Sequence, residues 1–128
     1  MSRSNWDKLS FWRGVILKLD TVTVESLSVT KTETLPKQYN VASRVFHSLS
    51  FRIKGENIIF DENKKMTSSA NSLTFVPAGK VYSHHIVTPS EQIVATFSTK
   101  ENIGDTFEIF TLPAHYNIGQ LFYDLYNR

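Results

Sequence analysis

The stretch Ser72-Leu-Thr-Phe-Val-Pro77-Ala-Gly79-Lys-Val-Tyr82-Ser-His84-His85 decides the fold that we expect for this chain. Two runs rich in β-branched and aromatic residues, 73–76 and 80–86, flank a Pro-Ala-Gly turn. This pattern predicts two short strands that form a hairpin. Because the second run places a phenolic hydroxyl and two imidazoles beside the turn, we expect the functional chemistry on or near this hairpin.

Further short strands are expected on both sides of this hairpin. β-branched and aromatic residues alternate with polar ones in segments separated by turn signals, namely 21–24, 27–32, 44–55, 57–60, 65–68, 92–98 and 106–110. Strands of this length with turns between them are typical of an antiparallel β-sandwich or small barrel.

The two ends of the chain show helical periodicity instead. The spacing predicts a short helix near the N-terminus and a longer one at the C-terminus, where Asn117 and Gln120 have capping-box spacing. The C-terminal segment carries an apolar stripe formed by Ile118, Leu121, Phe122 and Leu125. The expected organisation is an N-terminal extension with a helix (1–19), a β-barrel (20–113) and a C-terminal helix (114–128).

The composition is that of an ordinary single globular domain. The 128 residues are 41% hydrophobic, and the net charge of +2 is too small to indicate a nucleic-acid surface. The chain has no cysteine, which excludes disulfides, thiolate nucleophiles and sulfur-ligated zinc. No apolar run approaches the ~20 residues of a membrane-spanning helix. We therefore expect a cytoplasmic protein with no membrane partner.

Three segments carry a resemblance to a known family: Arg44…His47-Ser-Leu-Ser-Phe-Arg-Ile-Lys-Gly55-Glu56, then Asn71 to Tyr82, then Ile93-Val-Ala-Thr-Phe97. Together they resemble the N-terminal, cupin-like ligand-sensing domain of AraC-type transcriptional regulators, over roughly residues 20 to 128. The usual Gly-Asp of that family is Asn71-Ser72 here, and its second proline is Ala78. The resemblance implies a mainly β fold, a cupin-type double-stranded β-sandwich or barrel with a short N-terminal helix and a C-terminal helix.

The metal ligands of metal-binding cupins are replaced in this chain. Aligned on the family's motifs, Ser48 stands at the glutamate position and Tyr82 at the last histidine position. His84 and His85 are neighbours on one strand, point to opposite faces and cannot chelate one ion. We therefore expect no metal, no other cofactor and no catalytic residue, and the sequence gives no argument for an enzyme.

A small-molecule pocket is the remaining expectation. The resemblance places seven side chains on the inner face of the barrel: Arg44, Phe46, Ser48, Ser50, Arg52, Tyr82 and His84. Such groups suit a polyhydroxylated or anionic ligand. Periodicity alone favours the opposite face of the long strand, with Val45, Leu49, Phe51 and Ile53 buried and with Arg44 and Arg52 solvated. By default, His47 is a structural histidine.

The resemblance implies the effector-sensing and dimerisation domain of an AraC-type regulator. Its small-molecule effector, such as a sugar, would bind in a metal-free β-barrel pocket of a homodimer. DNA would be contacted only through a C-terminal helix-turn-helix domain that is absent from these 128 residues. The alternatives are a stand-alone cupin enzyme acting on a sugar or small acid, and a carbohydrate-binding module.

Overall fold

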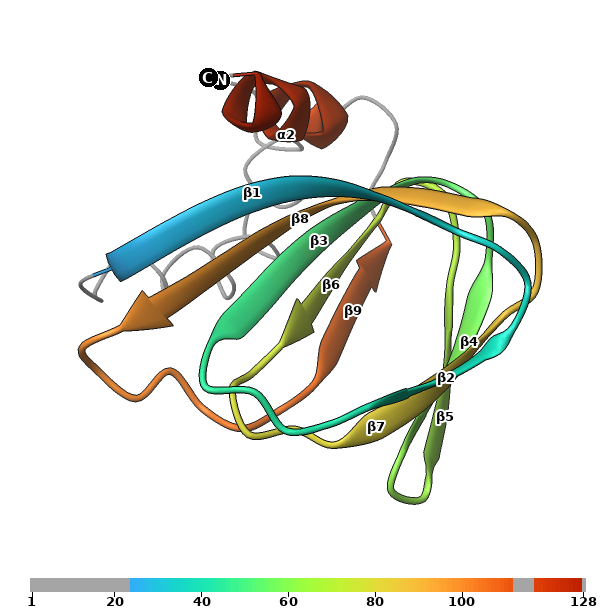
Figure 1. Ribbon diagram of the computed structural model, residues 1–128, viewed down its shortest axis with the longest axis horizontal. Coiled ribbons are helices and arrows are strands. Elements are labelled where there is room, and N and C mark those ends of the chain that lie inside the picture. The colour runs from blue at the N-terminus through green and yellow to red at the C-terminus, as the bar shows by residue number, and fades with distance from the viewer. Residues whose placement is uncertain (1–23, 112–116, 128) are drawn as a thin grey trace, which may run out of the picture.

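The computed structural model describes residues 24–111 and 117–127, which form two antiparallel sheets and one helix (Figure 1). The five-stranded sheet has the order β1 (Val24–Thr34), β8 (Ser90–Thr99), β3 (His47–Lys54), β6 (Ser72–Val76) and β9 (Glu108–Thr111). The four-stranded sheet has the order β2 (Gln38–Val41), β7 (Tyr82–Ile86), β4 (Asn57–Asp61) and β5 (Lys64–Ser68). Helix α2 (Ile118–Tyr126) follows.

The expected fold class is confirmed, because the chain is mainly β and its two sheets form a cupin-like sandwich with a C-terminal helix. The β segment expected over 27–32 lies within β1, which runs from Val24 to Thr34. One boundary differs from the expectation. Strand β3 begins only at His47, so Arg44 and Phe46 precede it. The predicted N-terminal helix lies outside the described residues.

The predicted hairpin around the Pro-Ala-Gly turn is wrong. Strand β6 pairs with β3 and β9, whereas β7 pairs with β2 and β4, so the turn carries the chain from one sheet to the other. The turn's amides bond to a distant segment: Ala78 N–H donates to His47 Nδ1 (2.9 Å) and Gly79 N–H to the Arg44 carbonyl (2.8 Å). Gly79 has φ +88°, a conformation that favours glycine. These long-range hydrogen bonds distinguish this crossing between the two sheets from the turn of a local hairpin.

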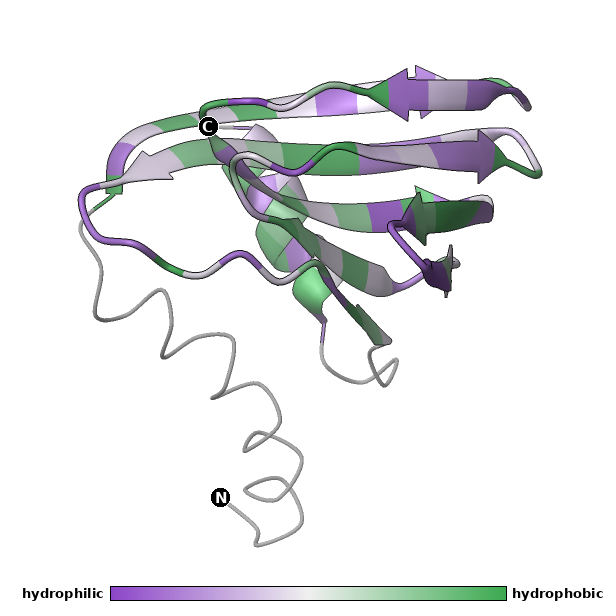
Figure 2. Ribbon diagram, turned by 90° about the horizontal axis from the view of Figure 1, so that it is seen from below, coloured by the Kyte–Doolittle hydropathy of each residue, from purple (hydrophilic) through white to green (hydrophobic). Residues whose placement is uncertain are grey.

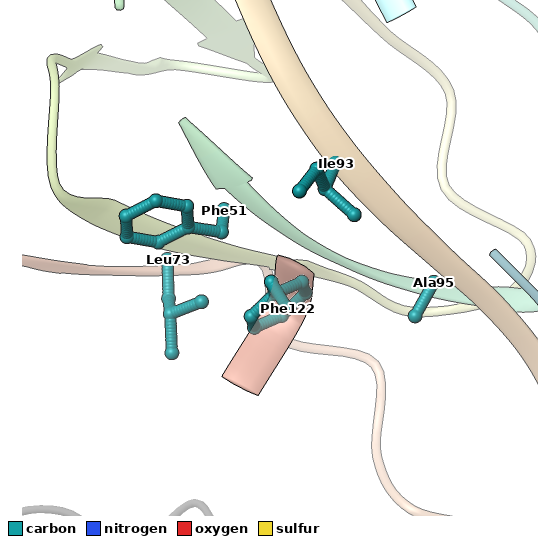
Figure 3. Packing of buried hydrophobic residues seen from close by; sticks show 5 residues of the cluster. All are labelled: Phe51, Leu73, Ile93, Ala95 and Phe122. Atoms are coloured by element: carbon teal, nitrogen blue, oxygen red, sulfur yellow. The ribbon is translucent and has the colours of Figure 1, made fainter. Parts of the chain in front are cut away.

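Helix α2 covers the outer face of the five-stranded sheet above β1, β8 and β3 (Figure 1). Phe122 of the helix forms an apolar cluster with four residues of the sheet, Phe51, Leu73, Ile93 and Ala95 (Figure 3). The rings of Phe51 and Phe122 stack with centroids 5.8 Å apart. Hydrophobic and hydrophilic residues alternate along the strands, as Figure 2 shows, and α2 packs on the apolar residues of the five-stranded sheet.

One detail of the C-terminal helix differs from the expectation. Asn117 caps α2 without a side-chain hydrogen bond, and Gln120 Nε2 instead donates to Asp124 Oδ1 (2.8 Å), so the predicted capping box is wrong. Within the apolar stripe, Phe122 is buried against the sheet, whereas Leu121 is 59% exposed. With nine residues, α2 is far shorter than a membrane span, and the described part of the chain has no helix that could cross a bilayer.

Replacing Phe122 with alanine tests the packing of α2. We expect Phe122→Ala to lower the free energy of unfolding by about 3–5 kcal/mol, because the ring is buried in the apolar cluster. The matched control Leu121→Ala, at an exposed position, should change it by less than about 0.5 kcal/mol. Urea unfolding followed by circular dichroism measures both. Equal effects of the two substitutions would contradict the described orientation of the helix.

Candidate ligand-binding site

A cavity of about 300 Å³ lies between the two sheets. Alternate residues of seven strands face it, as expected for strands whose side chains point to opposite faces in turn. The lining residues are Thr30, Thr32 and Thr34 of β1, Tyr39 and Val41 of β2, Arg44, Ser48, Ser50 and Arg52 of or just before β3, Asn57 and Ile59 of β4, Thr74 and Val76 of β6, Tyr82 and His84 of β7, Gln92, Val94 and Thr96 of β8, and Phe107.

The lining is polar and carries positive charge. Fourteen of the nineteen lining residues have a side chain that can form hydrogen bonds, and two of these are arginines. None of the nineteen is an aspartate or a glutamate. The volume is at the lower end of the range of small-molecule sites, which is about 300–1,000 Å³. The cavity therefore suits a small ligand with many polar groups.

Six of the seven predicted site residues line this cavity, and Phe46 does not. The Phe46 ring instead lies beneath the Arg44 guanidinium, 5.3 Å from its central carbon. The two faces of β3 are now assigned: Ser48, Ser50 and Arg52 point inward, and Phe51 packs beneath α2. The expectation from periodicity that Arg52 is solvated is wrong, since its residue is only 4% exposed. Ligand binding by these side chains stays a prediction.

Several lining residues were not singled out from the sequence. They are Tyr39, Asn57, Gln92 and the threonines of β1, β6 and β8. Alternating threonines in Thr30-Lys-Thr32-Glu-Thr34 were visible as a strand signal. Threonine is equally common on solvated strand faces, so this signal could not show that the threonines face a cavity.

Arg52 is held at the cavity wall by neutral partners. Its Nε donates to Ser68 Oγ (3.0 Å) and its Nη2 to Gln92 Oε1 (3.4 Å). Nη1 is buried and has no hydrogen-bond partner in the described part of the chain. Burial lowers the pKa of Arg52, but a guanidinium remains protonated in proteins. The cavity therefore borders on a buried cation with unused N–H groups.

A second cation lies beside Tyr82. Arg44 Nη2 donates to Tyr82 Oη at 3.4 Å, and the Tyr82 ring meets Phe107 edge-on with centroids 5.2 Å apart. Burial raises the pKa of Tyr82, while the nearby Arg44 acts in the opposite direction. Tyr82 is therefore a neutral phenol at physiological pH, able to donate or accept a hydrogen bond.

His84 lies near both arginines and forms a hydrogen bond with an amide side chain. Asn57 Nδ2 and His84 Nδ1 are 2.9 Å apart, and the Tyr39 ring stacks on the imidazole at 5.3 Å. Burial lowers the pKa of His84, and the charges of Arg52 and Arg44 lower it further. His84 is consequently neutral near pH 7.

His85 and His47 do not line the cavity. His85 is exposed, on the opposite face of β7 from His84. The His47 ring packs near Phe75 and Phe97, with centroids 6.0 and 5.5 Å away, and its Nδ1 accepts the Ala78 N–H. These contacts fit the structural role expected for His47. Within residues 24–111 and 117–127, no three His, Asp or Glu side chains are grouped to hold a metal ion.

No protein-family model and no curated protein matches this sequence. Among solved structures, the chain is similar to an apo variant of ToxT from Vibrio cholerae (11% identity, TM-score 0.62, 77% of this chain and 47% of that chain). It is similar to EutQ from Clostridium difficile (15% identity, TM-score 0.52, 62% of this chain and 68% of that chain). It is also similar to a cupin superfamily protein from Desulfitobacterium hafniense (14% identity, TM-score 0.50, 61% of this chain and 78% of that chain). ToxT has also been solved with an unsaturated fatty acid bound.

These similarities show a cupin-like fold. The chain spans about half the length of ToxT, and the similarity shows that the two proteins share a fold and nothing further.

The neutral, half-buried His84 makes stability depend on pH. Its pKa in the folded chain is lowered from the ordinary 6.5, so on acidification the unfolded chain takes up the proton first. The contribution of neutral His84 to the free energy of unfolding is complete above pH 6.5 and decreases as pH falls below that value. We expect His84→Gln to reduce the loss of stability between about pH 7 and about pH 5. The matched control His85→Gln should leave that loss unchanged. Urea unfolding at both pH values measures this loss of stability. Identical losses for wild type and His84→Gln would contradict the lowered pKa of His84.

Proposed function

We propose that this chain is the effector-binding domain of an AraC-type transcription regulator and that a small molecule occupies the cavity between its sheets. The observation that carries the proposal is the convergence of hydrogen-bonding side chains from both sheets on one cavity. The motifs of the sequence and the fold likeness to the AraC-type protein ToxT support the regulator context. DNA contacts are assigned to a C-terminal helix-turn-helix domain outside this sequence.

The proposed domain acts by binding rather than by catalysis. The two positions at which metal-binding cupins supply a glutamate and a histidine are Ser48 and Tyr82, and both line the cavity. A hydroxyl and a neutral phenol are poor ligands for a divalent metal. Ser48, at one of these positions, instead offers a hydrogen bond to a bound molecule.

Ligand binding is coupled to the C-terminal helix through β3. Arg52 faces the cavity, while the adjacent Phe51 stacks on Phe122 of α2 on the other side of the sheet. A ligand that favours one position of β3 would therefore favour one packing of α2. Such coupling requires that the ligand bind the two arrangements with different affinity.

The proposal includes a homodimer. Leu121 and Tyr126 on α2 are 59% and 42% exposed, which leaves apolar surface on the helix after it has packed on the sheet. Burial of such surface in a subunit interface is favourable.

A thermal-unfolding screen over sugars and small acids tests ligand binding. A ligand at about 100 times its Kd should raise the free energy of unfolding by about 2.7 kcal/mol. Val94→Trp should abolish the response, because Val94 lines the cavity and the indole would fill it. Val87→Trp, at an exposed position outside the lining, is the matched control and should keep the response. A response that survives Val94→Trp, or stoichiometric iron, manganese, nickel or zinc in the purified protein, would contradict the proposal and favour a cupin enzyme.

Light scattering of the purified chain tests the dimer. One chain has a mass of 14.7 kDa, and we expect a particle of twice that mass. A particle of single mass at every concentration measured would remove the homodimer from the proposal.

A further inference from the structure

Arg52 is a buried cation without a counter-charge. Its residue is 4% exposed, and its side-chain partners in the described part of the chain, Ser68 and Gln92, carry no charge. The carboxylates of Glu91 and Asp61 pair with Lys31 and Lys80. A buried ion costs several kcal/mol in desolvation unless a charge or strong hydrogen bonds compensate it. The partners of Arg52, the Ser68 hydroxyl and the Gln92 amide, are neutral and leave Nη1 unused.

Two further buried oxygen atoms beside Arg52 also lack partners. They are Thr32 Oγ1 and Asn57 Oδ1. The sheet registers relate both residues to Arg52: Thr32 and Arg52 both pair with Gln92, from either side of β8. Asn57, in the opposite sheet, pairs with Ser68, whose hydroxyl accepts the Arg52 Nε–H. Since buried polar groups are nearly always hydrogen-bonded, three such atoms among the residues that line one cavity point to a bound molecule.

We propose that the cavity binds a small hydroxylated carboxylate, whose carboxylate group is held by Arg52 and whose hydroxyl group donates to Asn57 Oδ1. This inference rests on the proposed function and names the class of its effector. The carboxylate accepts hydrogen bonds from Arg52 Nη1 and the Thr32 hydroxyl, so each of the three unpartnered atoms gains a partner.

The charge of the cavity selects an anion over a neutral sugar. Arg44 supplies a second positive charge, and none of the lining residues is acidic. A guanidinium matches the planar geometry of a carboxylate, and hydrogen bonds between charged groups are roughly twice as strong as neutral ones. A neutral sugar would leave the charge of Arg52 uncompensated.

The polarity of the cavity selects against a purely aliphatic acid. The wall near Arg52 consists of hydroxyl and amide side chains, including Thr30, Thr34 and Gln92. An alkyl chain placed against them would bury these groups without new hydrogen bonds, which is unfavourable. Hydroxyl groups on the ligand supply those bonds.

Matched pairs of probes separate the contributions of charge and hydroxyl groups. We would measure binding of gluconate, galacturonate and lactate by calorimetry and thermal unfolding. Glucose and galactose serve as neutral counterparts, hexanoate as a carboxylate without hydroxyl groups, and inorganic phosphate as another anion. We expect at least one hydroxycarboxylate to bind about tenfold or more tightly than its neutral counterpart and than hexanoate, since a hydrogen bond to a charged group contributes ~1.5–3 kcal/mol.

Arg52→Met is the decisive variant. It should abolish the preference for carboxylate, and it should not destabilise the ligand-free protein, because it replaces an uncompensated buried charge by an apolar chain of similar length. Ser68 keeps its hydrogen bond to Ser72 in this variant. Lys65→Met, at an exposed position of β5, removes the same charge away from the cavity and should retain the preference.

Four outcomes would overturn the inference. The first two are binding of no hydroxycarboxylate above its neutral counterpart and a preference that persists in Arg52→Met. The third is a marked loss of stability of the ligand-free Arg52→Met protein, which would make Arg52 a structural residue. Stronger binding of phosphate or hexanoate than of every hydroxycarboxylate would also overturn it. If a neutral sugar binds and Val94→Trp abolishes that binding, the proposed effector-binding function stands and only the carboxylate class fails.

Discussion

Strand β3 is buried on both faces, and each face holds a different kind of chemistry. Phe51 packs beneath α2, while the next residue, Arg52, lies at the cavity wall, and they are 6% and 4% exposed. Because successive side chains of a strand point in opposite directions, a single register sets both environments. A slip by one residue would place the guanidinium against Phe122 and the phenyl ring among hydroxyl groups. The helix packing and the site therefore depend on the same pairing of β3 with its neighbours.

The cavity exists because the inner faces of the sheets carry short polar side chains at one end and large apolar ones at the other. Ile59, Val76 and Phe107 form a buried cluster that fills the space between the sheets near Tyr82. Serines and threonines occupy the equivalent inward positions elsewhere and leave volume unfilled. The Pro-Ala-Gly turn crosses between the sheets directly after Val76, and His47 anchors it by accepting the Ala78 N–H. The histidine thus supports the boundary of the site without touching its interior.

Turn residues and period-two alternation are local signals, and they predicted the β-strands and a β-sandwich well. The cupin-like character of the sandwich was implied by the family resemblance instead. The local signals could not decide which face of 44–55 lines the cavity. The alternation Leu49-Ser-Phe-Arg52 shows which residues share a face, but in this fold the apolar face points outward to a helix and the polar face inward. The hairpin was predicted wrongly for a related reason. A tight turn looks the same in sequence whether it joins neighbours in one sheet or crosses between two, and the bonds that distinguish these cases come from residues about 30 positions earlier.

The position of Arg52 also bears on how a signal could leave the site. A guanidinium with only neutral acceptors makes the ligand-free state less stable than an apolar residue would, and an anion beside it removes that penalty. In the proposed complex, the free energy released on binding is concentrated on β3 rather than spread over the lining. Since β3 also carries the residue that stacks on α2, an arrangement of the helix that suits the neutralised strand gains most from the ligand. A ligand shifts a conformational equilibrium only by its differential affinity, and a buried uncompensated charge is an effective source of such a difference.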